Sequence, residues 1–269
     1  MRLLGAIVHL PFSLNTSYLR RSRLSVVGCS VSIRIRPPAR SRSENKLFSE
    51  ILVDLLNEND GNWELFNNSR SRLLSTELID YRDTLASQNP DILILNIGAV
   101  DAPNREIPKW YSDVLFRRKW LNLYGVASKF YHALIRRFLR NPLVYVRMKT
   151  PWVGIRKFEK SYTEFLKFVE KDLKSRVIIL GINPGSERIE NELPGSLDRY
   201  RQYNEKLRSI AERFDCDYVD MSELSAEDYF PDGVHYNAEG HRWCAEQLFR
   251  IIGQKEPSSR SEAAQKREF

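Results

Sequence analysis

The sequence has 269 residues, a length that fits one domain with a sizeable core rather than two ordinary domains. Its 42% hydrophobic and 29% charged residues are typical of a globular protein and exclude a disordered or fibrous chain. No window reaches the roughly 18 uninterrupted apolar residues of a membrane-spanning helix, and the formal net charge is +7.

The N-terminal segment has mixed features. Arg2 precedes an apolar run from Leu3 to Leu14 that resembles a signal peptide, but His9 and Pro11 interrupt the run and no small-residue cleavage pattern follows it. We therefore expect a poorly defined leader over residues 1–22. A cytoplasmic protein is favoured, and secretion or peripheral membrane association are the alternatives.

Apolar runs of strand length alternate with segments of helical period in most of the remaining chain. This pattern predicts crossover units that build a parallel sheet. The five predicted strands are Leu24 to Gly28, Trp63 to Asn67, Asp91 to Gly98, Arg176 to Ile182 and Cys216 to Met221. Apolar stripes predict helices over residues 47–56, 162–173, 200–214 and 245–252, the last with Asn237 as its N-cap, and a less regular helix over residues 76–87.

A basic and aromatic tract over about residues 102–160 interrupts this alternation, and we expect a mostly helical elaboration over one end of the sheet. In one interpretation the tract is an added pair of helices, whose charged side chains face solvent and whose aromatic rings face the protein interior. Alternatively the tract receives an anionic sugar, a glycolipid or a membrane surface. Residues 254–269 lose apolar side chains, so we expect a disordered tail after a domain over residues 23–253.

Ligands of an open parallel sheet gather beyond the carboxyl ends of its strands, so residues that follow strands are the candidates for chemistry. Ser30 follows the first strand, and Asp232 and His235 precede the last helix. A serine nucleophile needs an imidazole that takes its hydroxyl proton and a carboxylate that fixes that imidazole. Gly233 permits the tight turn that lets Asp232 reach one ring nitrogen of His235 while the other faces Ser30.

Taken together these residues resemble the SGNH hydrolases, also called the GDSL-like esterase and lipase family, from Leu24 to Ile252. The strongest match is Pro231-Asp232-Gly233-Val234-His235-Tyr236-Asn237, and Gly28-Cys29-Ser30 stands where the family has Gly-Asp-Ser. The resemblance implies a flavodoxin-like three-layer α/β/α fold with a five-stranded parallel sheet. It also implies a serine esterase or deacetylase with Ser30 as nucleophile, His235 as base and Asp232 as orienting carboxylate, without metal or cofactor.

Two positions depart from the family pattern. Val100 stands before Asp101 where the family has an oxyanion-donating asparagine, and Arg72 aligns with a glycine whose backbone N–H is the second donor. The candidates for oxyanion or substrate binding are Ser30, Arg72, Asn68, Arg70, Gly98, Asp101 and Arg105. The run from Gly98 to Arg105 is similar to a variant found among SGNH-type proteins of surface-polysaccharide gene clusters.

Other readings of the same residues remain open. Cys29 is expected to be a buried packing residue, and His241 a packing or helix-surface residue rather than a second base. The three cysteines show no C-x-x-C spacing and fit reduced, buried thiols.

The expected substrate is an acyl ester, either linked to a carbohydrate or carrying an anionic group. Alternatives are an acyltransferase, a non-catalytic SGNH-like binding protein or a flavodoxin-like module for a phosphorylated ligand, whereas the sequence argues against nucleic-acid binding because it contains no recognised module for it.

Overall fold

The computed structural model of the protein describes residues 21–34, 46–59, 61–117, 134–135, 138–222 and 224–254. The predicted tail beyond residue 254, the predicted leader up to residue 20 and residues 118–133 of the basic tract lie outside the described residues.

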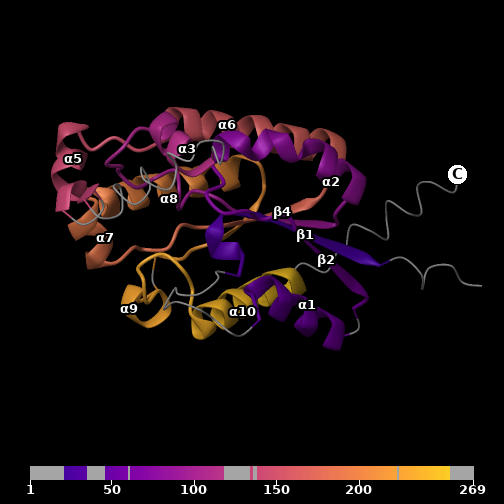
Figure 1. Ribbon diagram of the computed structural model, residues 1–269. Coiled ribbons are helices and arrows are strands. Elements are labelled where there is room, and N and C mark those ends of the chain that lie inside the picture. The colour runs from indigo at the N-terminus through magenta and orange to yellow at the C-terminus, as the bar shows by residue number, and fades with distance from the viewer. Residues whose placement is uncertain are drawn as a thin grey trace, which may run out of the picture.

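Five parallel strands form one sheet in the order β2-β1-β3-β4-β5 (Figure 1). The strands are β1 (Ser22–Gly28), β2 (Trp63–Asn67), β3 (Ile92–Asn96), β4 (Arg176–Leu180) and β5 (Asp217–Val219). The predicted sheet is therefore confirmed, with the last three strands shorter than the apolar runs that predicted them. Every residue of β3 is buried, as expected for a central strand covered on both faces.

Helices cover both faces of the sheet and make the three-layer fold (Figure 1). On one face α1 (Phe48–Glu58) packs against α10 (Ala238–Gln254). The other face carries α2 (Arg82–Gln88), α6 (Ile155–Phe168) and α8 (Ser196–Arg213). Asn237 accepts a hydrogen bond from the Gly240 N–H at 2.8 Å, which confirms it as the cap of α10.

Shorter helices were only partly predicted. The irregular helix expected over residues 76–87 is a 3₁₀ helix, Ser75–Tyr81, followed by α2. The predicted helix over residues 162–173 begins earlier, at Ile155, and ends in a π-helical turn, Val169–Leu173. Within the basic tract the described helices are α3 (Lys109–Arg117), α5 (Arg140–Val146) and the start of α6. The turns Ser30–Ser32, α7 (Glu187–Glu192) and α9 (Ala226–Tyr229) are too short for a periodic signal.

His241 is a packing residue between α1 and α10. It is buried, its ring stacks against Phe48 with centroids 6.2 Å apart, and its Nδ1 accepts the Phe48 N–H at 3.2 Å. Burial lowers the pKa of His241 to about 4, so the ring is neutral near pH 7. None of the described helices has the length and apolarity needed to cross a membrane.

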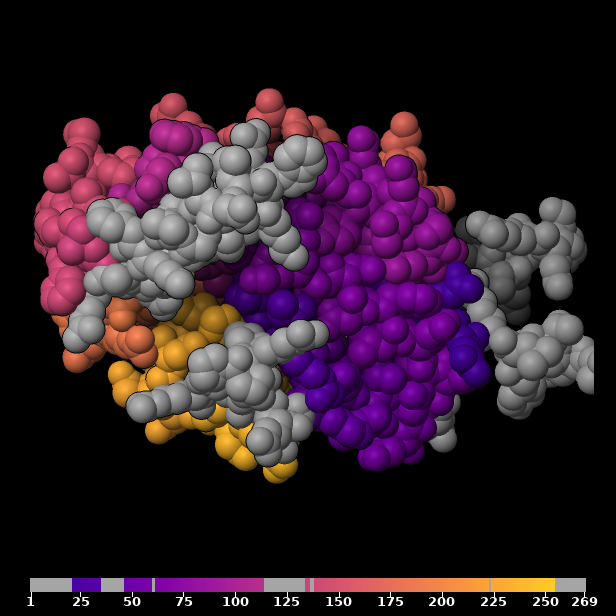
Figure 2. All heavy atoms as spheres, in the orientation of Figure 1, coloured from indigo at the N-terminus to yellow at the C-terminus, as the bar shows by residue number. Residues whose placement is uncertain are grey.

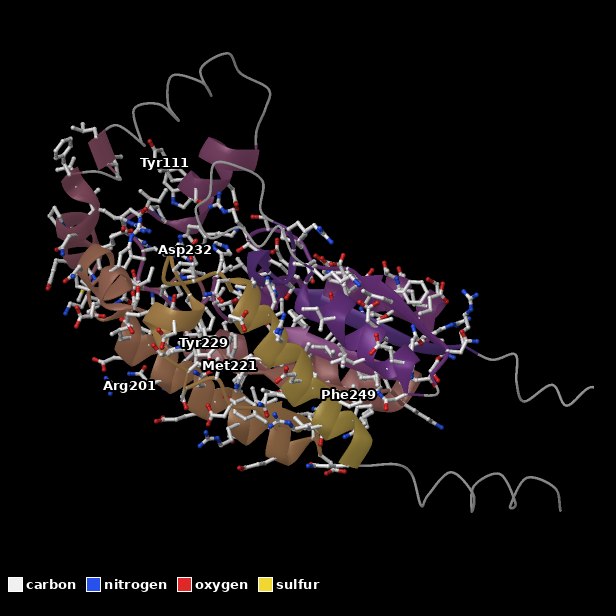
Figure 3. All side chains as sticks on the ribbon, turned by 90° about the horizontal axis from the view of Figure 1, so that it is seen from below. Tyr111, Arg201, Met221, Tyr229, Asp232 and Phe249 are labelled. Atoms are coloured by element: carbon white, nitrogen blue, oxygen red, sulfur yellow. The ribbon has the colours of Figure 1, made fainter. Side chains whose placement is uncertain are left out.

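The strand order places the loops that bear Ser30, Val100 and His235 at one end of the sheet. The order in which successive strands are added to the sheet reverses at β1. From β1, the chain adds β2 on one side, and it then adds β3, β4 and β5 on the other side. The carboxyl ends of strands at such a reversal leave a crevice for ligands. In Figure 3, Asp232 lies beyond that end, whereas Phe249 of α10 lies toward the opposite end.

Candidate active site

Ser30 begins a short 3₁₀ turn directly after β1, and the two neighbouring strands hold this turn. The Cys29 N–H donates to the Asn96 carbonyl at 3.2 Å, at the end of β3. The Asn96 side chain donates to Ser32 Oγ at 2.9 Å, and the Asn67 side chain, at the end of β2, donates to the Ser32 carbonyl at 2.9 Å. The turn that bears Ser30 is thus held by β3 on one side and by β2 on the other.

The loop that carries Asp232 and His235 is a tight turn fixed from β4. Gly233 has φ +82°, in the left-handed region, and a Cβ there would lie 2.3 Å from Ser186 Oγ, so a side chain is excluded by both strain and space. Buried Asn183, which follows β4, donates through its side chain to the Val234 carbonyl at 3.0 Å. The segment that follows β4 therefore fixes the position of the Asp232–His235 loop relative to the sheet.

The two segments meet in a continuous chain of hydrogen bonds. His235 Nε2 lies 2.9 Å from Ser30 Oγ, and His235 Nδ1 lies 2.7 Å from Asp232 Oδ2. The other carboxylate oxygen of Asp232 accepts the backbone N–H of His235 at 2.7 Å and of Val234 at 3.0 Å. Figure 2 shows the same meeting at the surface, where indigo residues after β1 adjoin orange-yellow residues near the C-terminus.

The electrostatic environment keeps Asp232 ionised. Burial by itself raises the pKa of this carboxyl, but the side-chain hydrogen bond and charge of His235 and two backbone N–H groups outweigh burial and bring the pKa well below its usual range. Cys29 is fully buried, as predicted, and burial raises its pKa to about 11, so the thiol stays protonated beside Ser30. The three cysteines are free.

A cavity of about 380 Å³ opens beside Ser30, within the size range of small-molecule sites. Loops after β1, β2 and β3, the start of α5, α7 and the His235 loop contribute to its wall. It is lined by Ser30, Arg72, Ala99, Val100, Pro103, Arg105, Glu106, Ser112, Arg140, Trp152, Ile189, Leu193, Tyr200 and Val234.

Arg72 has the backbone conformation of a glycine, the residue that the family resemblance predicts at this position. Its φ is +63°, in the left-handed region that favours glycine and that other residues adopt uncommonly. Its side chain lines the cavity, donates to Ser112 Oγ and lies over the Trp152 ring, with Cζ 5.1 Å from the centroid. Arg72 therefore contributes a cation to the cavity wall from a left-handed turn position.

Val100 and Asp101 take different directions from the turn that follows β3. Val100 lines the cavity, and its carbonyl accepts a hydrogen bond from Arg105 at 2.7 Å. Asp101 is fully buried away from the cavity wall and accepts from the Ser75 N–H at 2.9 Å and the Ser75 hydroxyl at 2.7 Å. Asp101, predicted from the sequence as a candidate for oxyanion or substrate binding, therefore contacts a neighbouring loop instead of the cavity.

The remaining sequence candidates lie outside the cavity lining. Gly98 has φ +137°, and a Cβ there would lie 2.7 Å from Ile182 Cδ1. Its role is therefore to allow the backbone of the turn after β3. The Asn68 side chain forms a reciprocal amide pair with Gln88, at 2.8 and 3.0 Å. Arg70 forms an ion pair with Glu77 at 3.1 Å. The side chains of Asn68 and Arg70 are therefore engaged elsewhere in the fold.

Sequence reasoning missed the asparagines that hold the site and several residues of its wall. Asn67 and Asn96 end strands that are otherwise largely apolar, and Asn183 follows another such strand; a polar residue at a strand end was the available signal. Trp152 and Arg140 were noted only as parts of the basic tract. Among the described residues no cluster of histidine, cysteine or acidic side chains is arranged to hold a metal ion.

Comparisons with known proteins show the family and the fold of the chain. Residues 28–243 match the model of the GDSL-like lipase/acylhydrolase family. An acetylxylan esterase from Geobacillus stearothermophilus, in a catalytic mutant form, superposes with a TM-score of 0.57 at 18% identity, covering 86% of this chain and 94% of that one. A lipase/acylhydrolase from Enterococcus faecalis gives a TM-score of 0.55 at 12% identity, with 87% and 96% covered. The sequence matches no curated protein.

Asp101 gives the site a pH-dependent stability. Burial raises its pKa to about 6, only partly offset by hydrogen bonds from Ser75. A carboxyl whose pKa is raised in the folded state stabilises the fold when protonated, so this contribution is present below pH 4 and is lost as pH rises through about 6. Asp101→Asn keeps an acceptor for Ser75 without the charge. We expect the free energy of unfolding of the variant relative to the parent to rise by about 2–3 kcal/mol between pH 4 and pH 7.5.

Urea unfolding at a series of pH values measures this difference, in which the titration of all other groups cancels. If the free energies of unfolding of the two proteins differ by the same amount at every pH, the raised pKa of Asp101 is contradicted.

Proposed function

Because the chain belongs to the GDSL-like lipase/acylhydrolase family, we propose that it hydrolyses acyl esters through a covalent intermediate on Ser30. The observation that carries this proposal is the hydrogen-bond chain from Ser30 Oγ through both nitrogens of His235 to Asp232. Its distances are those needed for a nucleophile, a base and a group that orients the base.

In this mechanism Asp232 accepts the Nδ1–H of His235, which leaves Nε2 as the proton acceptor for the Ser30 hydroxyl. Ser30 Oγ bonds to the ester carbonyl carbon while His235 takes the proton. The imidazolium then gives this proton to the departing alkoxide oxygen, and an acyl-enzyme remains. Water attacks the acyl group with His235 again as base, which releases the carboxylic acid and restores the serine.

The negative oxygen of the tetrahedral intermediate needs hydrogen-bond donors. We assign this role to the backbone N–H groups of Ser30 and Arg72, since Arg72 retains the left-handed backbone of a glycine. Val100 offers only a hydrocarbon side chain at the third position. Loss of one donor typically lowers the rate by about 10²- to 10³-fold, so the proposed enzyme is slower on simple esters than one with all three.

The substrate class that we propose is an O-acylated carbohydrate or a related acyl ester. The similarity of the fold to acetylxylan esterases supports this choice, and so does a polar, arginine- and tryptophan-lined cavity rather than a wholly apolar one. Transfer of the acyl group to a sugar hydroxyl instead of water uses the same residues.

One observation favours a second candidate, a binding protein of this fold that does not turn over its ligand. This observation is Val100, which cannot donate to an oxyanion. Such a protein binds its ester with unchanged affinity after Ser30→Ala or His235→Ala, and releases no product from small acetate esters.

The proposed roles predict a graded loss of activity on 4-nitrophenyl acetate. We expect Ser30→Ala and His235→Ala to lower kcat by at least about 10³-fold, and Asp232→Asn by roughly 10²- to 10⁴-fold, because its amide no longer favours the reactive tautomer. Exposed Ser87→Ala, far along the chain on α2, is the matched control and retains parental activity. Equal rates for parent and Ser30→Ala would exclude the mechanism.

The missing donor predicts a gain of function. Val100→Asn puts an amide N–H on the cavity wall, and we expect kcat for 4-nitrophenyl acetate to rise by roughly 10-fold or more. Val100→Ala controls for the change in volume and gives no such gain. If Val100→Asn is no faster than Val100→Ala, the oxyanion is already fully bound by other groups.

A further inference from the structure

Arg105 is a cation at the cavity wall that has no ion-pair partner within the described parts of the chain. Its guanidinium donates to the Val100 carbonyl at 2.7 Å, and its Nε is shielded from solvent and has no hydrogen-bond partner. No carboxylate of the described residues forms an ion pair with it. A charge removed from water without a partner is costly, so an anionic ligand group that pairs with it would stabilise it.

The neighbours of Arg105 include two further arginines, an acidic residue and an indole ring. Its Cζ lies 4.2 Å from the centroid of the Trp152 ring, and Arg72 lies over the same ring at 5.1 Å. Burial lowers the pKa of Arg105. The negative charge of Glu106 opposes this shift, and the weaker effects of Arg140 and Arg72 add to it. Two guanidinium groups on one indole ring therefore place two positive charges on the same part of the cavity wall.

The acidic groups nearby are already engaged. Glu106, the acidic residue among the described cavity-lining residues, lies 3.6 Å from Arg140, which also pairs with Glu192. This ion-paired cluster engages Arg140, whereas Arg105 forms no ion pair with a carboxylate of the described residues and is a source of positive potential in the cavity.

The position of Arg105 is fixed before any ligand binds. The Arg147 side chain donates to the Arg105 carbonyl at 2.7 Å and to the Ile107 carbonyl at 2.8 Å. The Trp152 indole N–H donates to the same Ile107 carbonyl at 2.9 Å. Backbone and stacking partner are thus tied together, and the Val100 carbonyl holds one end of the guanidinium, whose planar fork matches a planar oxygen anion.

From these contacts we infer that the ester carries an anionic oxygen group, such as a carboxylate, that binds to Arg105 and Arg72 in the cavity beside Ser30. The inference rests on the proposed function, because the anion is part of the molecule that Ser30 attacks. The anion lies on either the acyl or the alcohol side of the ester, and the two sides are separable by experiment.

The test uses two matched pairs of esters. The first pair is 4-nitrophenyl hemisuccinate and its methyl ester, with the charge on the acyl side. The second pair is an O-acetylated methyl glucuronide and its methyl ester, with the charge on the alcohol side. We expect kcat/KM to be about 10- to 100-fold higher for the charged member of one pair, with an advantage that shrinks as salt increases.

Variants then assign the preference to Arg105. Arg105→Gln removes the advantage of the charged member, and Arg105→Lys, which keeps the charge but loses the planar fork, retains part of it. Arg201→Gln removes a surface charge on the outer side of α8, away from Asp232 in Figure 3, and leaves the ratio unchanged. If Arg105→Gln unfolds, as judged by circular dichroism, the Arg105→Lys variant and the salt dependence of the parent decide.

Each outcome separates this inference from the proposed function. A ratio near one for both pairs overturns the inference while ester hydrolysis stands. An equal loss on charged and neutral esters in Arg105→Gln also overturns it, because that result makes Arg105 an oxyanion donor. If no ester is turned over, calorimetry with the same four compounds decides: tighter binding of a charged member by at least about 10-fold supports the anion site, and equal binding rejects it.

Discussion

The account depends on one contact, the hydrogen bond at 2.9 Å between Ser30 Oγ and His235 Nε2. It joins a turn at the start of the described chain to a loop that precedes the last helix. Neither group can reach the other unless the sheet places the ends of β1 and β4 on the two sides of β3, as the observed strand order does. The asparagines that end β2 and β3 and follow β4 convert this arrangement into fixed side-chain positions.

Much of the fold could be predicted from the sequence because its signals are local. Five strands and four of the long helices follow from apolar periodicity, and Gly233 marked a turn whose left-handed backbone the structure shows. The pairing of Asp232 with His235 is also local, since three positions separate them. The position of Ser30 after β1 followed from the general rule for parallel sheets.

The errors and omissions concern contacts between distant segments. Asn68 and Arg70 follow the same strand as Arg72, yet their partners are Gln88 and Glu77, which sequence order does not reveal. The wall formed by Trp152, Arg140 and Arg105 brings together residues from both ends of the basic tract. Part of this tract thus lines the cavity, while Arg147 also carries a structural role through backbone carbonyls. Composition alone does not separate these two uses of arginine.

Peptide mass spectrometry after reaction with a fluorophosphonate tests the central contact most directly, because the reagent modifies only a serine that a neighbouring base activates. The account predicts a single stoichiometric adduct on the peptide that contains Ser30, formed slowly or not at all in His235→Ala. A protein that stays unmodified, or an adduct of equal yield on Ser30 when His235 is absent, would contradict it.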